Sequence, residues 1–336
     1  MSIEKKLLKI NKEDKHLDAV LRPISWDDYV GQGKIKKGLR MILGAARKRN
    51  ESSDHLLFCG QPGLGKTTLA YLTAKEMGGG LKTLSAPSVE RIGDLAAALS
   101  NLENRDILFI DEAHRLKSHL EEALYSAIDA GKIYIPIGKG PSSRVISLDL
   151  PSFTLIAATT RINLISPPLR SRFGAIFRLD YYEIDDISAI IRRSAEILGI
   201  KITPAAVLLI AKASHFTPRM ANRLLKRSRD FVEMNNLKIV DEKTVLETFD
   251  ILEIDEVGLE SHDRRLMEII IKKFRGGPVG ISALSSTLGE EKDAIEEIYE
   301  PYLVKIGFLH RTPKGRMASK EAKEWLENKK NGIQNS

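Results

Sequence analysis

A glycine-rich segment of the chain has the residue types and spacing of a phosphate-binding loop. Its sequence, GQPGLGKT over residues 60–67, matches the pattern G-x-x-x-x-G-K-[ST] in full. Glycines such as Gly65 let backbone N–H groups close around phosphates, and the start of the following helix adds its positive end. We expect Lys66 to contact the β- and γ-phosphates and the Thr67 hydroxyl to bind Mg²⁺. A chance glycine-rich turn is the alternative, but an apolar strand pattern precedes the segment and a helical pattern follows it.

Two acidic residues follow another apolar run, DILFI at residues 106–110. A buried strand there would deliver Asp111 to its carboxyl end, where it can hold a metal's water shell, and Glu112 would polarise the attacking water. Phosphoryl transfer needs charge neutralisation and a positioned nucleophile more than covalent chemistry. Acids commonly follow strands in loops, so this prediction depends on the upstream glycine loop. The letters DEAH also occur in a helicase superfamily, but the sequence offers no second motor domain, and we expect His114 merely to begin a helix.

A threonine and an arginine further along the chain would complete this chemistry. Thr160 follows the apolar run 153–158, which would lie beside the strand of the acidic pair. Its hydroxyl can hold the attacking water or sense the γ-phosphate; a strand-end threonine without a role is the alternative. Arg172 follows the next helix on the flank of the domain, so its natural target is a neighbouring subunit's γ-phosphate, as an arginine finger in trans. Arg170 is then a salt-bridge residue. The arrangement predicts a ring or a similar oligomer.

The order of the patterns predicts an α/β domain followed by a helical one. Strands that are apolar throughout and alternate with helical patterns indicate a parallel sheet covered on both faces, here over residues 1–182. Residues 183–253 are helical in pattern and form the expected lid, in which Thr217 and Pro218 mark a helix start. Arg219 would lie in the first turn of that helix and report the state of the nucleotide; a surface salt bridge is the alternative.

The last segment, residues 254–336, predicts a winged-helix domain, because helical patterns precede an extended stretch with a Pro-Lys-Gly turn. The segment holds 14 acidic and 14 basic residues and is neutral as a whole. Its helix after Gly289 is acidic and would be repelled by phosphates, whereas the expected wing carries Arg311, Lys314 and Arg316. We therefore expect sequence-independent contact with the DNA backbone, led by Arg311 and Arg316. A solvated charged hairpin is the alternative.

An insertion between the acidic strand and the Thr160 strand predicts a β-hairpin near residues 133–150. Ile133, Ile135 and Ile137 lie on its first strand. The insertion is unusually apolar for a protruding hairpin, which suggests a surface that docks another protein. Packing against its own domain is the alternative.

The composition is that of a globular protein, with 43% hydrophobic and 29% charged residues. No window approaches the ~18 consecutive apolar residues of a membrane span, and the charged start has no apolar core of a signal peptide. The single cysteine, Cys59, excludes an internal disulfide and a cysteine-rich metal site. We expect a cytoplasmic protein without a membrane partner, whose net charge of +7 is compatible with nucleic acid.

In this order, the phosphate loop, acidic strand, threonine, arginine finger and lid arginine resemble the AAA+ family. More narrowly, the sequence resembles the RuvB family, the motors of the bacterial Holliday-junction branch-migration complex. The resemblance covers nearly the whole chain, and its last two blocks are the most specific because general AAA+ proteins lack them. The blocks are LRPISWDDYVGQ (21–32), HLLFCGQPGLGKTTLA (55–70), DILFIDEAHRL (106–116), DLPSFTLIAATTR (149–161), PPLRSRFG (167–174), TPRMANRLLKRSRDF (217–231), GGPVGISALSSTLGEE and PYLVKIGFLHRTPKGRMA.

The resemblance implies a fold and a set of ligand contacts. The fold is an α/β AAA+ P-loop ATPase domain with an all-helical lid and a C-terminal winged-helix domain. Adenine and ribose contacts would come from Leu21, Arg22 and Tyr182. Phosphate and metal contacts would come from Gly63, Lys66, Thr67 and Thr68. The chain departs from the family at Asp129-Ala130-Gly131, where an acidic pair followed by an aromatic residue is usual.

The resemblance also implies an activity and partners. The activity is ATP hydrolysis, with Mg²⁺, coupled to branch migration of Holliday junctions in homologous recombination and DNA repair. A hexameric ring would act on double-stranded DNA, with RuvA docked at the hairpin and the RuvC resolvase alongside. A clamp-loader or initiator subunit is one alternative, but a clamp loader should end in a helical collar. A nucleotide-dependent transcription regulator is another, but it would need a sequence-reading helix, and the acidic helix is unsuited to that.

Overall fold

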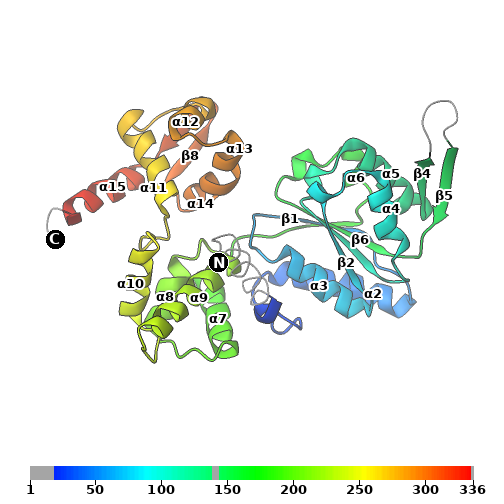
Figure 1. Cartoon of the computed structure of the whole chain (residues 1–336), viewed down its shortest axis with the longest axis horizontal. Coiled ribbons are helices and arrows are strands. Elements are labelled where there is room, and N and C mark those ends of the chain that lie inside the picture. Colours follow the sequence, from blue (N-terminus) through cyan, green and yellow to red (C-terminus); the bar gives the residue numbers. More distant parts are fainter. Residues whose placement is uncertain (1–18, 138–143, 334–336) are drawn as a thin grey trace, which may run out of the picture. The chain divides into compact units, whose positions relative to one another are not determined.

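The computed structural model describes residues 19–137 and 144–333, and the chain divides into two compact units between Ala189 and Ile190 (Figure 1). Among the described residues, the first unit contains a five-stranded sheet in the order β2–β3–β6–β1–β7. The strands are β1 (Leu56–Cys59), β2 (Leu81–Ser85), β3 (Ile107–Asp111), β6 (Thr154–Thr159) and β7 (Ala175–Arg178). All neighbours run parallel, so the carboxyl ends of the strands meet at one edge. The predicted parallel sheet is confirmed, and β6 lies beside β3 as expected.

Helices cover both faces of this sheet, as Figure 1 shows. They are α2 (Gly33–Arg49) and α3 (Lys66–Met77) on one face, and α4 (Ile92–Ser100) and α5 (Ser118–Ala130) on the other. Successive strand residues point to opposite faces. Leu57 and Leu108 pack with Leu99 and Leu124 of α4 and α5, whereas the adjacent Phe58 is fully buried from the opposite face. Two covered faces explain why β1 and β6 are buried at every position and β3 at every position but its last.

The first unit also contains the predicted β-hairpin. Its strands β4 (Lys132–Ile137) and β5 (Arg144–Asp149) pair antiparallel, with Ile133 opposite Leu148. The predicted turn of the hairpin lies outside the described residues. Short connecting elements complete the unit: η1 (Ala86–Ser88), η2 (Ala113–Arg115), η4 (Ile162–Leu164) and α6 (Pro167–Arg170).

The second unit begins with the helices of the predicted lid. They are α7 (Ile184–Ile197), whose first residues belong to the first unit, α8 (Pro204–Lys212), α9 (Pro218–Met234) and α10 (Glu242–Ile251). Thr203 and Thr217 accept hydrogen bonds from backbone N–H groups in the first turns of α8 and α9, and a proline opens each helix. These caps satisfy N–H groups that have no partner within the helix.

A winged-helix fold follows the lid. Its elements are α11 (Ser261–Glu268), the π-helical η5 (Ile269–Lys273), α12 (Ile281–Leu288), α13 (Lys292–Ala294), the π-helical η6 (Ile295–Tyr299), α14 (Glu300–Lys305), β8 (Leu309–Thr312), β9 (Gly315–Ala318) and α15 (Lys320–Ile333). Leu266, Ile270, Leu284, Ile295 and Leu303 form its core. The strands β8 and β9 make the predicted wing hairpin. Across the described part of the chain, every helix is too short or too polar to cross a membrane.

Candidate nucleotide site and partner surfaces

The glycine loop lies where β1 ends and α3 begins. Gly60 has φ 152° and Gly65 has φ 99°, a backbone conformation that residues with a Cβ rarely adopt. A Cβ on Gly60 would lie 2.8 Å from the carbonyl oxygen of Leu179, so space as well as conformation requires glycine there. The Gly60 N–H donates to the carbonyl of Thr159 at the end of β6. The loop is therefore tied to the neighbouring strand that carries the predicted threonine.

The predicted phosphate-binding side chains occupy the start of α3. Lys66 is buried, and its Nζ donates to the carbonyl oxygens of Gly60 and Gln61 at 2.7 and 2.9 Å. Thr67 and Thr68, in the first turn, are partly exposed. The lysine ammonium thus contacts the carbonyls of its own loop.

Two tyrosines lie against the phosphate-binding loop, and only one of them, Tyr182, is among the predicted site residues. The Tyr182 hydroxyl donates to the Leu64 carbonyl at 3.2 Å and lies 3.1 Å from the Tyr29 hydroxyl. A Cβ on Gly65 would lie only 2.8 Å from that Tyr29 hydroxyl. Burial raises the pKa of Tyr182 to about 12 and raises the pKa of Tyr29 as well, so both hydroxyls keep their protons. The only sequence signal for Tyr29 was its place in the block at residues 21–32.

The residues predicted to contact adenine and ribose differ in how far they are exposed. Leu21 and Tyr182 are buried, with 6% and 4% of their surface exposed. Arg22 is partly exposed, and its guanidinium carbon lies 5.8 Å from the ring centre of Tyr71 on α3. Tyr182 supports the phosphate loop through its hydroxyl, so its established contact is structural.

The acidic pair ends β3, as predicted. Asp111 is the last residue of the strand, and its Oδ1 accepts a hydrogen bond from the Glu112 N–H at 3.0 Å. Glu112 adopts φ 51°, which turns the chain away from the strand. Its carboxylate is about half exposed and lies 3.4 Å from the guanidinium of Arg115. Residues in sparsely populated backbone regions cluster at functional sites.

The two threonines at the end of β6 have separate environments. Thr159 is buried; its hydroxyl lies 3.0 Å from His114 Nδ1 and accepts from the Arg161 N–H. Thr160 is partly exposed and follows the last strand residue. The Thr159 hydroxyl is therefore engaged within the protein, and Thr160 is the more exposed of the two. His114 lies in η2, in keeping with its interpretation as a helix-start residue.

The predicted arginine finger is held by its own chain. Arg172 Nε lies 3.0 and 2.9 Å from the two carboxylate oxygens of Asp129, and Nη2 donates to the same group at 2.7 Å. Nη1 donates to the Pro168 carbonyl, and the guanidinium lies 4.5 Å from the Tyr125 ring centre. Among the described residues Arg170 forms no ion pair, so its predicted role as the salt-bridge residue is not seen. Arg172 forms an ion pair instead, with Asp129. Asp129, which holds this arginine, belongs to the segment 129–131 in which the chain departs from the family pattern.

The lid arginine is exposed. Arg219 is the second residue of α9, and the preceding Thr217 and Pro218 fix the start of that helix. The predicted position in the first turn is confirmed.

The hairpin requires a correction to the predicted docking residues. Ile133 is fully buried in the core between the sheet and the helices α4 and α5, and Ile135 packs against that core. The side chain of Ile137 lies outside the described residues. Ile133 is therefore unavailable to a partner, because alternation along β4 turns it inward. Among the described residues of the hairpin, the large exposed apolar side chains are those of Tyr134, Val145, Ile146 and Leu148.

The wing also differs from its prediction. Arg316 is only 15% exposed, and its guanidinium binds Glu300 at 2.7 Å and Glu296 at 2.5 Å. Arg311 is half exposed and binds the same buried Glu300 at 2.6 Å. The acidic helix was expected only to repel phosphates, but its glutamates neutralise Arg316. Arg316 is therefore poorly placed to lead the contact with DNA. Lys314, at the turn of the wing, is exposed and has no ion pair within the described chain.

The fold and the site together define the class. A phosphate loop after β1, an acidic pair after β3 and a threonine after β6, followed by a helical lid and a winged-helix fold, are those of an AAA+ ATPase with a C-terminal winged-helix domain. Three family models match the chain in succession. They are the Holliday junction DNA helicase RuvB P-loop domain (residues 21–179), the RuvB AAA lid domain (182–255) and the RuvB C-terminal winged helix domain (256–327). The chain belongs to the RuvB family of AAA+ P-loop ATPases, which are branch-migration motors.

Solved structures agree with this assignment. The Thermotoga maritima RuvB Holliday junction branch migration motor is 44% identical, with a TM-score of 0.84 over 92% of this chain and 98% of that one. Two variants of the Thermotoga maritima protein, one with a lysine-to-arginine and one with a proline-to-glycine substitution, are 45% identical over 91% of this chain and 98% of theirs. Their TM-scores are 0.84 and 0.85.

Proposed function

We propose that this chain couples ATP hydrolysis to branch migration of Holliday-junction DNA in homologous recombination and DNA repair. It would act as a hexameric ring with RuvA and alongside the RuvC resolvase, in the cytoplasm. The observation that carries this proposal is the unbroken succession of three RuvB domain matches on one chain. The similarity to the Thermotoga maritima RuvB Holliday junction branch migration motor supports it.

The residues at the sheet edge suit ATP. Loop N–H groups, including those of Gly63 and Gly65, would bind phosphate oxygens together with Thr68, and Lys66 would exchange its loop carbonyls for the β- and γ-phosphates. Leu21, Arg22 and Tyr182 would flank the nucleoside, Tyr182 acting chiefly by supporting the loop.

The donor set also fits Mg²⁺. The Thr67 hydroxyl and the Asp111 carboxylate are oxygen donors, and Mg²⁺ prefers oxygen while keeping several waters and substrate phosphates. The described residues contain no group of three acidic, histidine or cysteine side chains that could hold an ion alone. When bound, the ion would neutralise charge on the phosphates.

Three further residues would act on the attacking water and the γ-phosphate. Glu112 would polarise the water; its exposed pair with Arg115 is of the kind worth about 0–1 kcal/mol, so turning towards the water costs little. Thr160 would hold the water or sense the γ-phosphate. Arg219 would report the nucleotide state to the lid.

Arg172 would complete the site of the next protomer in the ring. Its guanidinium must leave at least part of the pair with Asp129 to reach a neighbouring γ-phosphate. The pair therefore holds the arginine near the flank of the domain until a neighbour is bound.

DNA contact would fall to Lys314 at the tip of the wing, assisted by the exposed half of Arg311. Both would bind phosphates without reading the DNA sequence. Each contact should therefore increase the salt dependence of the affinity for DNA.

RuvA would dock on the face of the hairpin opposite to Ile133. Tyr134 and Val145 lie on that face and are 45% and 64% exposed, so glutamate there should block an apolar interface without disturbing the core. We expect Tyr134→Glu with Val145→Glu to abolish RuvA binding, measured by calorimetry, and to leave basal ATPase unchanged. Met41→Glu, at an equally exposed position on α2, is the control. If the hairpin variant bound RuvA with wild-type affinity, the hairpin would be ruled out as the docking site.

The deciding experiment is ATP-dependent dissociation of a synthetic four-way junction, with and without RuvA. Glu112→Gln serves as the hydrolysis control. Dissociation that needs ATP and Glu112, and that RuvA stimulates, is the expected result. ATP hydrolysis without junction movement in the presence of RuvA would reject the proposal and leave a clamp-loader-like or regulatory ATPase.

A further inference from the structure

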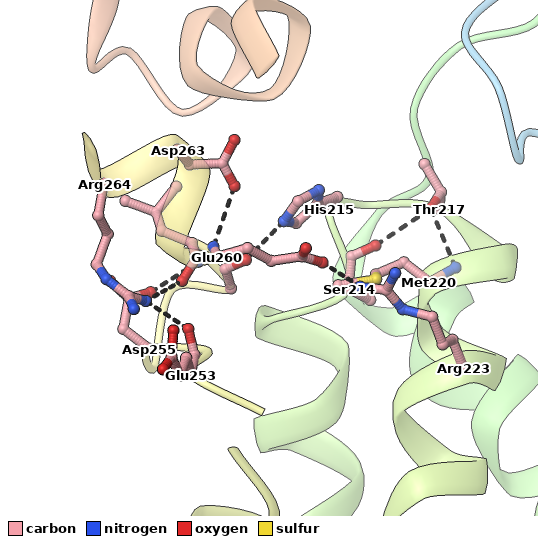
Figure 2. A network of polar contacts seen from close by, with 12 residues as sticks. Ser214, His215, Thr217, Met220, Arg223, Glu253, Asp255, Glu260, Asp263 and Arg264 are labelled. Atoms are coloured by element: carbon pink, nitrogen blue, oxygen red, sulfur yellow. Dashed lines mark hydrogen bonds and ion pairs between the residues drawn. The ribbon is translucent and has the colours of Figure 1, made fainter. Parts of the chain in front are cut away.

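The short segment between α8 and α9 is an ordered elbow. Ser214 and Thr217 are buried, the Ser214 hydroxyl donates to the Ala211 carbonyl at 2.7 Å, and the Thr217 hydroxyl donates to the Ser214 carbonyl at 3.2 Å. Thr217 also caps α9 by accepting from the Met220 N–H (Figure 2). The residues between these two anchors, His215 and Phe216, therefore have a fixed path.

His215 and Phe216 both adopt the left-handed backbone conformation, with φ 53° and 54°. A side chain with a Cβ disfavours this region, and such residues persist only where surrounding contacts determine them. Two in succession in one loop, neither of them glycine, call for such contacts.

The contacts that hold them come from the winged-helix fold. The His215 ring stacks on Tyr302 of α14, with ring centres 3.6 Å apart and planes 10° apart. Its Nε2 lies 2.7 Å from the Gly258 carbonyl oxygen and must donate to it, which defines the tautomer. The Phe216 ring lies 6.2 Å from that of Tyr302, and Lys305 Nζ lies 5.4 Å from the Phe216 ring centre.

The winged-helix side of this contact is also held in place by its own contacts. Tyr302 belongs to the winged-helix core, and its hydroxyl donates to the Val257 carbonyl. Gly258, at φ 85°, approaches the lid so closely that a Cβ there would lie 2.5 Å from the Ala213 carbonyl oxygen. The His215 ring therefore meets a surface in which both the α14 side chain and the linker backbone are fixed.

One ion pair and several hydrogen bonds hold the linker from α10 to α11, as Figure 2 shows. Arg264 donates to the carbonyls of Glu253 and Leu259 at 2.6 Å each. Asp255 accepts from the Val257 and Leu259 N–H groups. Glu260 pairs with Arg223 of α9, one turn beyond Arg219. The winged-helix fold thus contacts the lid at the elbow and on α9 itself.

We propose that His215 and Tyr302 are positioning residues that fix the winged-helix fold to the first turn of α9. Arg219 lies four residues after His215, with the capping Thr217 and the rigid Pro218 between them. A change in the position of Arg219 must therefore move the elbow, and the stacked rings carry that movement to the DNA-binding fold. The inference rests on the proposed role of Arg219 in sensing the nucleotide, but the mechanical link itself does not.

The test variant is His215→Gly, because glycine fits the left-handed backbone while losing the ring stack and the hydrogen bond to Gly258. His215→Phe is the conservative variant, since it keeps the stack. The control is His262→Ala, which removes a ring stacked on Tyr299 wholly within the winged-helix fold. Phe216→Gly replaces His215→Gly if the latter fails to fold, because it too relieves the backbone while losing contact with Tyr302.

Two readouts on the full chain separate positioning from stability. The first is junctions dissociated per ATP hydrolysed in the presence of RuvA. The second is the distance distribution between spin labels at Met234→Cys and Ile298→Cys, positions that are 82% and 67% exposed, while the natural Cys59 is buried. For His215→Gly we expect ATPase within twofold of wild type, at least a tenfold loss of junctions per ATP, and a broadened distribution. His215→Phe should recover most of the ratio, and His262→Ala should change neither readout.

A wild-type ratio of junctions to ATP in His215→Gly would overturn the inference. A proportional loss of ATPase and dissociation with an unchanged distribution would overturn it as well, because the residue would then act on hydrolysis. If wild type dissociates no junction, the proposed function fails, and the distance distribution alone decides: broadening in His215→Gly supports the link, and an unchanged distribution rejects it.

Discussion

Replacing Glu300 with glutamine tests whether the wing arginines stabilise their own domain. The Glu300 side chain has no exposed area, and its two oxygens lie 2.6 Å from Arg311 Nε and 2.7 Å from Arg316 Nε. Glutamine keeps the volume and removes the charge. Removing one partner of a buried ion pair costs about 3–5 kcal/mol, because the other charge stays buried. Arg311 is half exposed and can be rehydrated, so we expect the lower end, about 3 kcal/mol.

Urea unfolding followed by Trp325 fluorescence measures this cost. The Trp325 ring lies 5.7 Å from that of Phe308 and packs against the winged-helix core. The chain has two tryptophans, so a Trp26→Phe background isolates the signal. Glu324→Gln is the matched control, since its pair with Lys320 is exposed and should contribute less than about 0.5 kcal/mol. A loss below about 1 kcal/mol for Glu300→Gln would refute the reasoning, because the carboxylate would then not be needed to neutralise the arginines.

The same reasoning separates stability from DNA affinity on the wing. Lys314→Ala should leave the unfolding free energy within about 0.5 kcal/mol of wild type. It should also lower the salt slope of DNA affinity by about 1, as expected for one lost phosphate contact. Arg316→Ala should destabilise the domain instead, because Glu300 then keeps only Arg311 as its cationic partner. An unaltered salt slope in Lys314→Ala would exclude that lysine from the DNA contact.

Three further outcomes follow from the structure. Asp129→Asn should lower the KM for ATP of the assembled ring about two- to fivefold, because an exposed pair worth up to about 1 kcal/mol no longer competes for Arg172; a higher KM would mean that Asp129 orients the finger instead. Burial raises the pKa of Asp263 from 3.8 to about 6. The folded state therefore binds more protons than the unfolded state between these values, and the stability contribution present below pH 4 is lost as pH rises through 6. Asp263→Asn should raise the free energy of unfolding by roughly 2–3 kcal/mol at pH 8 and change it little near pH 4, and a gain that is the same at both pH values would contradict this cause. Ile133→Glu should cost several kcal/mol by calorimetry because it buries a charge, whereas Val145→Glu should stay within about 0.5 kcal/mol; equal costs would contradict the assigned faces of the hairpin.

The sequence predicted the parts of this protein whose chemistry depends on covalent order. The spacing from Gly60 to Thr67 specifies a loop and a helix start, and the apolar run before Asp111 specifies a buried strand with an acid at its end. The Thr217-Pro218 pair specifies a capped helix, which places Arg219 in its first turn. In each case the signal and the structure it predicts lie within a few residues, so no tertiary information is needed.

Only the tertiary structure determined which side chains are already engaged. Arg172 meets Asp129 across 43 residues, Tyr182 meets Tyr29 across 153, and Arg316 meets Glu300 across 16. The sequence identified the arginines as cations but not their partners, because ion pairs form wherever packing brings distant segments together. Similarly, the inward orientation of Ile133 depends on which face of the hairpin the core covers, and the stack of His215 on Tyr302 depends on how two helical folds pack. Local pattern sets the chemistry that a residue can perform, and long-range packing decides whether that residue is available to perform it.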